Sequence, residues 1–401
     1  MQHLDAKQTR AIALLSLAAF ASAASLRVSD PLLRQLASDF GTTTGKAGQA
    51  IYAFSVAYGL FQALYGPLGD RYGKYRLVAL ATLGCIIGSA GASLAISFGW
   101  LLFFRALAGA TAAGIIPLSM AWIGDSVSYE HRQSTLARFL SGQILGVIGG
   151  QLIGGLFADT LGWRWGFVFL TAVYFVVGVL LLAEHRKNAS TQAGPASSVH
   201  QTVPFLAQML SVLRIGWARR VLVTVSLEGM ALFGALAFVP SYLHSRFGVS
   251  LIAAGTILGG FGVGGLSYTF VAKRLVSRLG ERGLALGGGL LLGFAFLLLF
   301  LATKWFLTVP ACFVAGLGFY MLHNTLQTNA TQMAPNARGT AVSLFASAFF
   351  LGQSVGVAAA AVVVDSASAS LLFAGASLLL PLVGLSFTSA LRQRPLDLVS
   401  A

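Results

Sequence analysis

The feature that most constrains the fold of this chain is a series of apolar segments, each between 18 and 24 residues long. A helix of about 20 apolar residues crosses a bilayer, because it rises about 1.5 Å per residue and the hydrocarbon core is about 30 Å thick. Only 9% of the residues are charged, which excludes an ordinary water-soluble enzyme, since too little polar surface would remain to cover its core. The segments lie at 11–34, 47–67, 77–98, 101–123, 137–157, 166–183, 220–243, 251–272, 283–301, 306–326, 341–362 and 370–390.

The Lys and Arg residues predict how these segments cross the membrane. Because the number of segments is even, both ends of the chain lie on one side. With the N-terminus in the cytoplasm, 19 of the 26 Lys and Arg residues fall on the cytoplasmic side, five on the other side and two inside spans. Positively charged loops stay in the cytoplasm, so this distribution predicts cytoplasmic termini. It also accounts for the net charge of +14 without a nucleic-acid partner.

The first segment and the cysteines each admit a second interpretation. Lys7 and Arg10 precede the apolar run 11–24, which imitates a cleavable signal peptide, but eleven further spans favour a retained first helix. Cys85 and Cys312 lie inside apolar segments, which predicts that they are packing residues rather than part of a disulfide or a metal site.

No phosphate loop, metal-ligand cluster or nucleophile with a base occurs at motif spacing, so we expect no cofactor, no ATP-driven step and no enzyme activity.

A change of composition divides the chain near its middle. Residues 184–204 are polar and contain Ser, Thr, Gly and Pro, which predicts a flexible linker. We therefore expect an N-terminal six-helix bundle over 1–183, a cytoplasmic linker over 184–218 and a C-terminal six-helix bundle over 219–401. Within the linker, apolar residues recur every four positions beside arginines, which is typical of a helix on an anionic membrane surface; the alternative is an extension of the seventh span. These residues are Phe205, Met209, Leu213 and Trp217, with Arg214, Arg219 and Arg220.

The two predicted bundles share a sequence register. Five identities recur at a separation of 207 residues, which indicates an internal duplication. Parallel repeats of six spans are a recurring construction of secondary transporters, whose substrate site lies near the midplane where the halves meet. The duplication therefore favours a transporter. The identical pairs are Phe40/Phe247, Gly41/Gly248, Gly48/Gly255, Arg71/Arg278 and Gly73/Gly280.

A polar motif lies between the second and third segments. Residues 66–76 read Gly-Pro-Leu-Gly-Asp-Arg-Tyr-Gly-Lys-Tyr-Arg, which resembles the cytoplasmic signature of the major facilitator superfamily. Glycines allow a short turn between close helices, and a carboxylate at a helix end pairs with basic neighbours. The resemblance implies a conformational latch in which Asp70, Lys74 and Asp125 form a charge cluster; the alternative is a loop anchored by its positive charges alone. The latch residues are Gly66, Asp70, Arg71, Gly73, Lys74 and Asp125.

The second half carries a degraded copy of this motif at residues 277–282. Ser277 takes the place that Asp70 has in the first half. We therefore expect the second latch to be weaker than the first.

Two further segments resemble signatures of the same superfamily. Arg105, in the fourth span, begins a sequence similar to one whose arginine assists proton coupling, with Ala108 where glutamine is usual. A guanidinium keeps its charge in lipid, so Arg105 should face a cavity or a carboxylate, or else extend to the outer interface. The fifth span is similar to the antiporter signature, with Gln151 in place of its proline. Its small residues predict close helix packing, through Gly146, Gly150, Gly154 and Gly155.

Two acidic residues lie inside predicted spans. Asp30 precedes Pro31, and a continuous helix would place Arg27, Asp30 and Arg34 on one face. Asp30 is then either a proton carrier or part of a static ion pair that holds a kink in the first span. Glu228 is the only acid of the seventh span, and a carboxyl group among apolar residues is easier to bury neutral than charged. We expect Glu228 to couple transport to protons; the alternative is a helix–helix hydrogen bond. The expected central residues are Glu228, Asp30, Arg27 and Arg105.

Aromatic and amide side chains inside the spans supply candidate contacts for a substrate. They combine apolar faces with hydrogen-bonding groups, which suits a cavity, although packing is the alternative role for each of them. The candidates are Tyr58, Gln62, Tyr65, Gln143, His323 and Asn324.

The resemblance covers nearly the whole chain, and residues 30–41 are similar to the start of bacterial twelve-span drug or sugar efflux proteins. It implies an all-helical protein of the bacterial inner membrane, with twelve spans in two bundles related by a pseudo-twofold axis, acting as a monomer. The implied function is proton-coupled efflux of small, partly apolar molecules by alternating access. The second hypothesis is a sugar or metabolite carrier, which could work as an importer. The remote third is a membrane enzyme or receptor.

Overall fold

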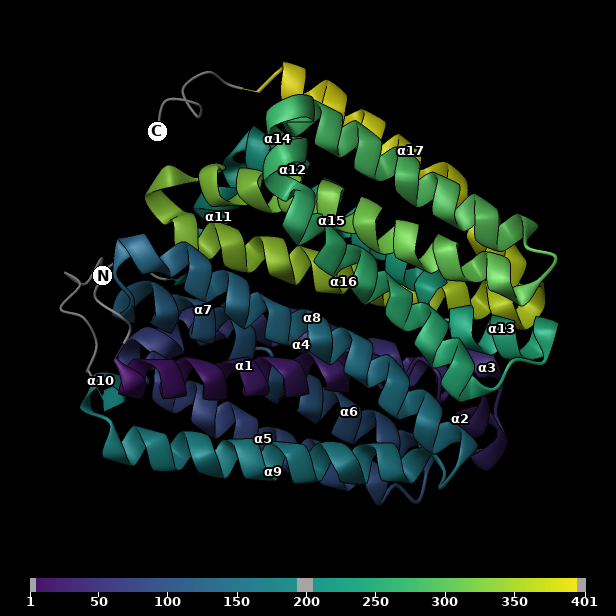
Figure 1. Ribbon diagram of the computed structural model, residues 1–401, viewed down its shortest axis with the longest axis horizontal. Coiled ribbons are helices and arrows are strands. Elements are labelled where there is room, and N and C mark those ends of the chain that lie inside the picture. Colours follow the sequence, from purple (N-terminus) through teal and green to yellow (C-terminus); the bar gives the residue numbers. More distant parts are fainter. Residues whose placement is uncertain (1–4, 193–204, 395–401) are drawn as a thin grey trace.

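The computed structural model describes residues 5–192 and 205–394, which form helices and their connections (Figure 1). Residues 193–204 of the predicted linker lie outside the described residues. The elements are α1 (Ala6–Arg27), α2 (Leu33–Asp39), α3 (Thr44–Ala47), α4 (Gln49–Tyr72), α5 (Lys74–Ser93), α6 (Phe98–Ala112), α7 (Ile115–Ser126), α8 (Tyr129–Asp159), α9 (Trp163–Lys187), α10 (Ala189–Gln192), α11 (Phe205–Arg214), α12 (Gly216–Leu236), α13 (Val239–Phe247), α14 (Leu251–Leu301), η1 (Trp305–Leu307), α15 (Thr308–Gln332), η2 (Pro335–Ala337), α16 (Arg338–Ser366) and α17 (Ala369–Arg392).

Ten helical segments of the described chain are long and apolar enough to cross a membrane. One of them, α14, contains a break at Gly280, whose φ of 61° and ψ of −179° are not helical. Tyr268 and Leu284, on either side of this break, share a cluster with Met321, although a straight helix would separate them by about 24 Å. The helix therefore folds back at Gly280 and supplies two spans. With α4, which is 24 residues long and packs against α6 and α16, the described chain has twelve spans.

Three of the predicted spans are interrupted, because breaks follow α1, α6 and α12. Pro31 and Pro240 lie at the first and third of these breaks, where proline cannot donate the amide hydrogen that a continuous helix needs. The break after α1 overturns one expectation. Arg34 does not share a helix face with Asp30; it lies on α2, and its Nη1 donates a hydrogen bond to Ser245 Oγ at 3.1 Å.

The helices form two groups that lie side by side (Figure 1). One group holds α1 to α9 and the other α11 to α17, each around its own buried apolar cluster. They meet where α8 packs against α14 and where α4 packs against α16. Both ends of the described chain lie at one end of the molecule with α10 and α11, and α2, α3 and α13 lie at the other (Figure 1). We call these the terminal end and the opposite end.

The start of the predicted flexible linker is helical in the structure. The last turn of α9 and all of α10 cover residues 184–192. Glu184 is buried, and its Oε2 lies 3.0 Å from Arg10 Nε, which fastens this polar segment to α1. The composition alone did not indicate that contact.

The apolar stripe predicted for the linker helix divides in the structure. Met209 packs against the C-terminal core, and Trp217 is buried in α12. The exposed apolar side chains of α11 are Leu206, Leu210 and Leu213. The stripe therefore does not form one membrane-facing surface.

Candidate functional site

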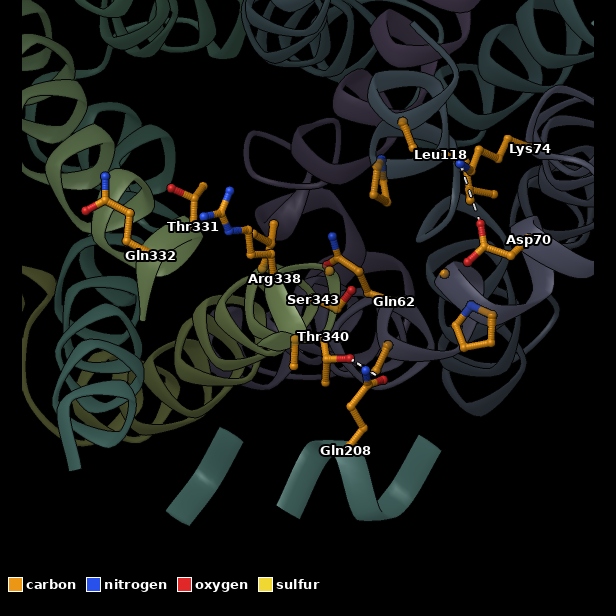
Figure 2. Close-up of a pocket in the computed structure, with 18 residues that line it drawn as sticks. Gln62, Asp70, Lys74, Leu118, Gln208, Thr331, Gln332, Arg338, Thr340 and Ser343 are labelled. Carbon is orange, nitrogen blue, oxygen red and sulfur yellow. Dashed lines mark hydrogen bonds and ion pairs between the residues drawn. The ribbon is translucent and has the colours of Figure 1, made fainter. Parts of the chain in front are cut away.

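A cavity of about 830 Å³ lies between the two groups of helices, toward the terminal end. Its walls come from α4, α5 and α7 on one side, and from α15, η2 and α16 on the other, with Gln208 of α11 beside them. Figure 2 shows Asp70 and Lys74 on one wall and Thr331 and Gln332 on the other. Of the residues that the sequence singled out, Gln62, Gly66, Asp70 and Lys74 line this cavity.

Gln62 gives the cavity a buried polar group. Its side chain is 8% exposed, and Oε1 finds no hydrogen-bond partner among the described residues. A buried amide oxygen without a partner is costly, so this position suits a ligand or water that donates a hydrogen bond. Ser343 of α16 lines the same cavity from the other group of helices.

The buried charges of the N-terminal group meet beyond the end of α1. Arg27 Nη1 lies 3.9 Å from Asp30 Oδ2, and both residues are fully buried. Gln151 of α8 donates from Nε2 to the same oxygen at 2.7 Å. The position where the superfamily signature has proline thus holds a hydrogen-bond partner of Asp30.

Gln353 of α16 joins this charged pair to the other group of helices. Its Oε1 accepts a hydrogen bond from Arg27 Nη2 at 3.2 Å, and its Nε2 donates to Ser55 Oγ of α4 at 2.8 Å. Sequence reasoning did not select Gln353 or Ser55. A signal was present, because Gln353 is the only amide side chain in the apolar run 341–362.

Arg105 is buried beside a backbone carbonyl and aromatic rings. Its Nε donates to the backbone oxygen of Ala50 at 3.1 Å, and its Cζ lies 4.5 Å from the ring centroid of Phe54. The side chain is 1% exposed and forms no ion pair within the described chain. A carbonyl oxygen and an aromatic face therefore stabilise this guanidinium, while its Nη2 is buried with no hydrogen-bond partner among the described residues. Arg105 does not extend to the membrane interface, and its facing a cavity stays a prediction.

Glu228 and His323, which the sequence gave no reason to pair, are in direct contact. Glu228 is fully buried on α12, and its Oε2 lies 2.7 Å from His323 Nδ1 of α15. Glu228 Oε1 has no hydrogen-bond partner among the described residues. The pair therefore holds a buried acid beside a base that can carry a proton.

Aromatic rings surround this acid–base pair. The His323 ring lies 4.7 Å from the centroids of both Phe319 and Phe349. Phe233 contacts these two rings edge to face, at 5.5 and 5.6 Å. Arg27 Cζ lies 3.9 Å from the Phe233 centroid. One layer of aromatic rings therefore separates the Arg27–Asp30 pair from the Glu228–His323 pair.

The charged centre lies deeper than the residues that line the cavity. Ser55 is seven residues before Gln62 on α4, a distance of about 10 Å along a helix. Gln353 is ten residues beyond Ser343 on α16, or about 15 Å. The cavity therefore approaches the centre from the terminal end.

The remaining candidate substrate contacts have different surroundings. Tyr58 is buried. Its ring centroid lies 4.3 Å from that of Phe350, across the boundary between the two groups. Tyr65 donates from its hydroxyl to Thr111 O at 3.1 Å, within its own group. Gln143 on α8 and Asn324 on α15 are half-buried. Of the six predicted contacts, only Gln62 lines the cavity, so the structure does not bring the set together at one place.

The three charges of the predicted latch meet at the terminal end. Lys74 Nζ lies 2.5 Å from Asp125 Oδ2 and 3.5 Å from Asp70 Oδ1. Gly73 allows this arrangement, because its φ of 89° is one that residues with a side chain rarely adopt. Arg71 lies outside the cluster, with its Cζ 5.3 Å from the Tyr72 ring.

The second half has a different contact at the equivalent positions. Glu281 and Gln332 lie 207 residues after Lys74 and Asp125. Arg394 bridges them: its Nη1 lies 3.4 Å from Glu281 Oε2, and its Nη2 donates to Gln332 Oε1. The copy therefore holds an acid where the first half has Lys74, and its cation comes from the segment after α17.

The glycines of α8 face two different neighbours. Added side-chain carbons at Gly146, Gly150 and Gly154 would lie 2.3 to 2.5 Å from backbone oxygens of α1 and the turn that follows it. At Gly155, such a carbon would lie 2.4 Å from Leu251 O, across the boundary between the groups. The first three glycines allow packing within the N-terminal group, and Gly155 allows α8 to contact α14.

Comparison with known proteins agrees with this arrangement. A family model described as Major Facilitator Superfamily matches residues 15–357. The "Uncharacterized MFS-type transporter YceJ" of Bacillus subtilis (strain 168) is 24% identical, over 82% of this chain and 83% of that protein. The "Multi-drug resistance efflux pump PmrA" of Streptococcus pneumoniae serotype 4 is also 24% identical, over 54% of this chain and 57% of that protein.

The fold also resembles solved structures. The crystal structure of a POT family transporter in complex with 5-aminolevulinic acid has a TM-score of 0.78 and 14% identity, over 94% of this chain and 95% of that chain. At this identity the likeness is one of fold. It confirms the predicted all-helical architecture. The family model and the relatives show that the protein is a multi-pass membrane transporter of small molecules rather than an enzyme. Because the family model spans most of the sequence, the chain belongs to the Major Facilitator Superfamily.

Proposed function

We propose that this transporter exports small, partly apolar molecules in exchange for protons. The observation that carries the proposal is the fully buried Glu228 carboxylate, 2.7 Å from a histidine and surrounded by aromatic rings. Apolar surroundings favour the neutral carboxyl group, and a protonated histidine favours the carboxylate. Both protonation states therefore have a physical source of stabilisation. The efflux pump among the relatives supports export of drug-like compounds.

In this proposal the two groups of helices move as rigid bundles, which the sequence bounds at 1–183 and 219–401 with the linker 184–218 between them. In the structure the first group continues to Lys187, and α11 packs with the second. The excess of Lys and Arg in segments at the terminal end supports cytoplasmic termini in a bacterial inner membrane. The cavity then opens to the cytoplasm, and the bundles rock about the charged centre to open the other side. We propose that a monomer carries out this cycle, with the lipid bilayer as its surroundings and no nucleic-acid partner.

Coupling follows if a proton and the substrate favour different states of the centre. A ligand shifts a conformational equilibrium only through its different affinity for the two states. Protonation removes the charge of Glu228 and changes its attraction to His323. Asp30 supplies a second acid on the other side of the aromatic layer, beside Arg27. Gln353 touches both bundles and links the N-terminal charges to the helix that lines the cavity.

The proposal is tested by reconstituting the protein in liposomes that have a pH gradient. The probe is ethidium, a fluorescent aromatic cation that represents drug-like compounds. We expect ethidium to accumulate against its gradient when protons move the other way, and an added ethidium gradient to drive proton movement. Transport that follows only the ethidium gradient, with no proton movement, would contradict proton exchange.

A second candidate is a carrier of sugars or other polar metabolites, working as an importer. The cavity favours it through the amide and hydroxyl groups of Gln62, Gln208, Gln332, Thr340 and Ser343. A panel of sugars and metabolites separates the candidates, because a ligand that binds the folded state raises the melting temperature, and does so more as its concentration exceeds its Kd. Stabilisation by a sugar and none by ethidium would favour the carrier.

The latch yields a prediction of moderate size. We expect Asp125→Asn to slow transport more than Asp70→Asn, since Lys74 lies 2.5 Å from Asp125 and 3.5 Å from Asp70. Exposed ion pairs contribute about 0.2–1 kcal/mol, so the change in rate is roughly fivefold or less. Substrate affinity should stay constant, because the latch acts on the populations of conformations. Initial transport rates and ligand-induced thermal shifts measure the two quantities.

The matched control for the latch is Glu281→Gln, which neutralises the acid of the corresponding cluster in the second half. It breaks the contact with Arg394 and leaves Lys74 with both of its partners. Equal losses of affinity and rate in Asp125→Asn would contradict a latch.

A further inference from the structure

Two carboxylates at the opposite end each join one bundle to the other. Asp159, the last residue of α8, accepts a hydrogen bond at Oδ2 from the backbone N–H of Ile252 in α14, at 2.6 Å. Asp365, near the end of α16, accepts one at Oδ1 from the N–H of Gly45 at 2.9 Å and one at Oδ2 from the Thr43 hydroxyl at 2.5 Å. One carboxylate belongs to the N-terminal bundle and the other to the C-terminal bundle.

These contacts are copies of one another in the internal duplication. The donors Gly45 and Ile252 are 207 residues apart, and the acceptors Asp159 and Asp365 are 206 apart. The pseudo-twofold relation therefore places the same carboxylate contact twice across the boundary. The sequence contained this signal, but sequence reasoning selected neither aspartate.

The carboxylates do more than cap the helices they contact. Thr43 Oγ1 already accepts a hydrogen bond from Lys46 N at 3.1 Å, and Ser250 Oγ accepts one from Ala253 N at 3.3 Å. Each of these segments thus has a cap from its own sequence. The aspartates supply additional bonds that come from the other bundle, so they fasten the bundles to each other.

The backbones of the two bundles touch beside these bonds. An added side-chain carbon at Gly45 would lie 2.2 Å from Ala361 O, and one at Gly255 would lie 2.4 Å from Gln151 O. Gly45 lies on α3, just before α4, and Ala361 lies on α16. At the terminal end the cavity separates α4 from α16. The bundles are therefore closed at the end where the aspartates lie and open at the other.

We propose that Asp159 and Asp365 are a matched pair of gate residues that hold the opposite end shut in this state and release it when that end opens. This inference rests on the alternating-access part of the proposed function and is independent of proton coupling. Both carboxylates are exposed, so water replaces the lost hydrogen bonds when the bundles separate. The gate is consequently reversible, and each aspartate biases the equilibrium by a moderate factor.

The test measures opening through a cysteine placed in the closed interface. Val357 on α16 is fully buried. Its Cγ1 would lie 3.6 Å from a Cβ atom at Gly48, which belongs to the N-terminal bundle. Val357→Cys is labelled by a water-soluble thiol reagent only when this end opens. The chain without this substitution supplies the background, because Cys85 and Cys312 are buried.

We expect Asp159→Ala, which removes one hydrogen bond, to raise the labelling rate about fivefold, and Asp365→Ala, which removes two, to raise it roughly 25-fold. The double variant should raise it roughly 125-fold, because distant sites contribute additively to the free energy. Gly255→Ala should also raise labelling, since its added carbon would lie 2.4 Å from Gln151 O and push the backbones apart without touching either carboxylate. That variant keeps the test decisive if an aspartate variant folds poorly.

Asp39→Ala is the matched control. Asp39 is an exposed aspartate at the same end, but its partners Arg164 and Trp163 belong to its own bundle. Labelling should not change in this variant. An equal rise in Asp39→Ala, or unchanged labelling in both gate variants, would overturn the proposal. Because no substrate or proton gradient is present, loss of proton coupling in another assay does not affect this result.

Discussion

Glu228→Gln is expected to abolish proton-coupled transport. The glutamine fills the same buried space and still offers an oxygen to His323, whose Nδ1 lies 2.7 Å from the carboxylate. It cannot change its charge, so one half of the acid–base pair no longer binds and releases a proton. Ethidium accumulation driven by a pH gradient should fall to the level of liposomes without protein. Flow down the ethidium gradient should remain, because the cavity lining is unchanged.

The matched control is Glu184→Gln, which alters another buried glutamate. Glu184 lies at the terminal end, 3.0 Å from Arg10, and far along the chain from the aromatic layer. This variant should retain coupling. The role assigned to Glu228 is wrong if Glu228→Gln still moves protons when ethidium is added. In that case the contact with His323 is the helix–helix hydrogen bond that the sequence left as the alternative.

Arg27→Met is expected to cause the largest loss of stability. Removing one partner of a buried ion pair costs about 3–5 kcal/mol, because the other charge stays buried without compensation. Arg27 lies 3.9 Å from Asp30, and both are fully buried. The substitution also removes the donor to Gln353, at 3.2 Å, which weakens a contact between the bundles. Thermal unfolding in detergent should show a large decrease in melting temperature.

A double variant identifies the cause of that decrease. Arg27→Met combined with Asp30→Asn leaves no buried charge at this place, and Gln151 still has an oxygen to donate to. We expect the double variant to regain much of the stability that Arg27→Met loses. Arg164→Met is the control, because Arg164 pairs with Asp39 at 3.1 Å in an exposed position, where ion pairs contribute about 0–1 kcal/mol. A similar loss in both single variants would contradict the buried-pair explanation.

The two experiments address separate parts of the centre. Glu228 belongs to the C-terminal bundle and Asp30 to the N-terminal bundle, with Phe233 between Arg27 and the rings that hold His323. If Arg27→Met with Asp30→Asn folds and still couples protons, Glu228 is sufficient for coupling. If that variant transports without proton movement, Asp30 takes part. A static ion pair and a titrating site thus lead to different outcomes.

Much of the architecture follows from local features of the sequence. Apolar length predicted the spans, since each helix satisfies its own backbone hydrogen bonds in lipid. The loop motif predicted a charge cluster whose members Asp70 and Lys74 are close in sequence, and the structure brings Asp125 to them. Breaks such as the one between α6 and α7 were missed, because a hydropathy pattern continues across a short non-helical turn.

By itself, the sequence determined that the chain is a doubled set of membrane helices with few buried charges. Hydropathy can be judged from neighbouring residues, and the duplication can be recognised from identities 207 residues apart. Only the tertiary structure decided the partners of those charges. Glu228 meets His323, Gln353 joins Arg27 to Ser55, and the gate aspartates meet backbone amides of the other bundle. Each contact depends on how helices far apart in the chain are rotated and packed, and no local pattern specifies that rotation.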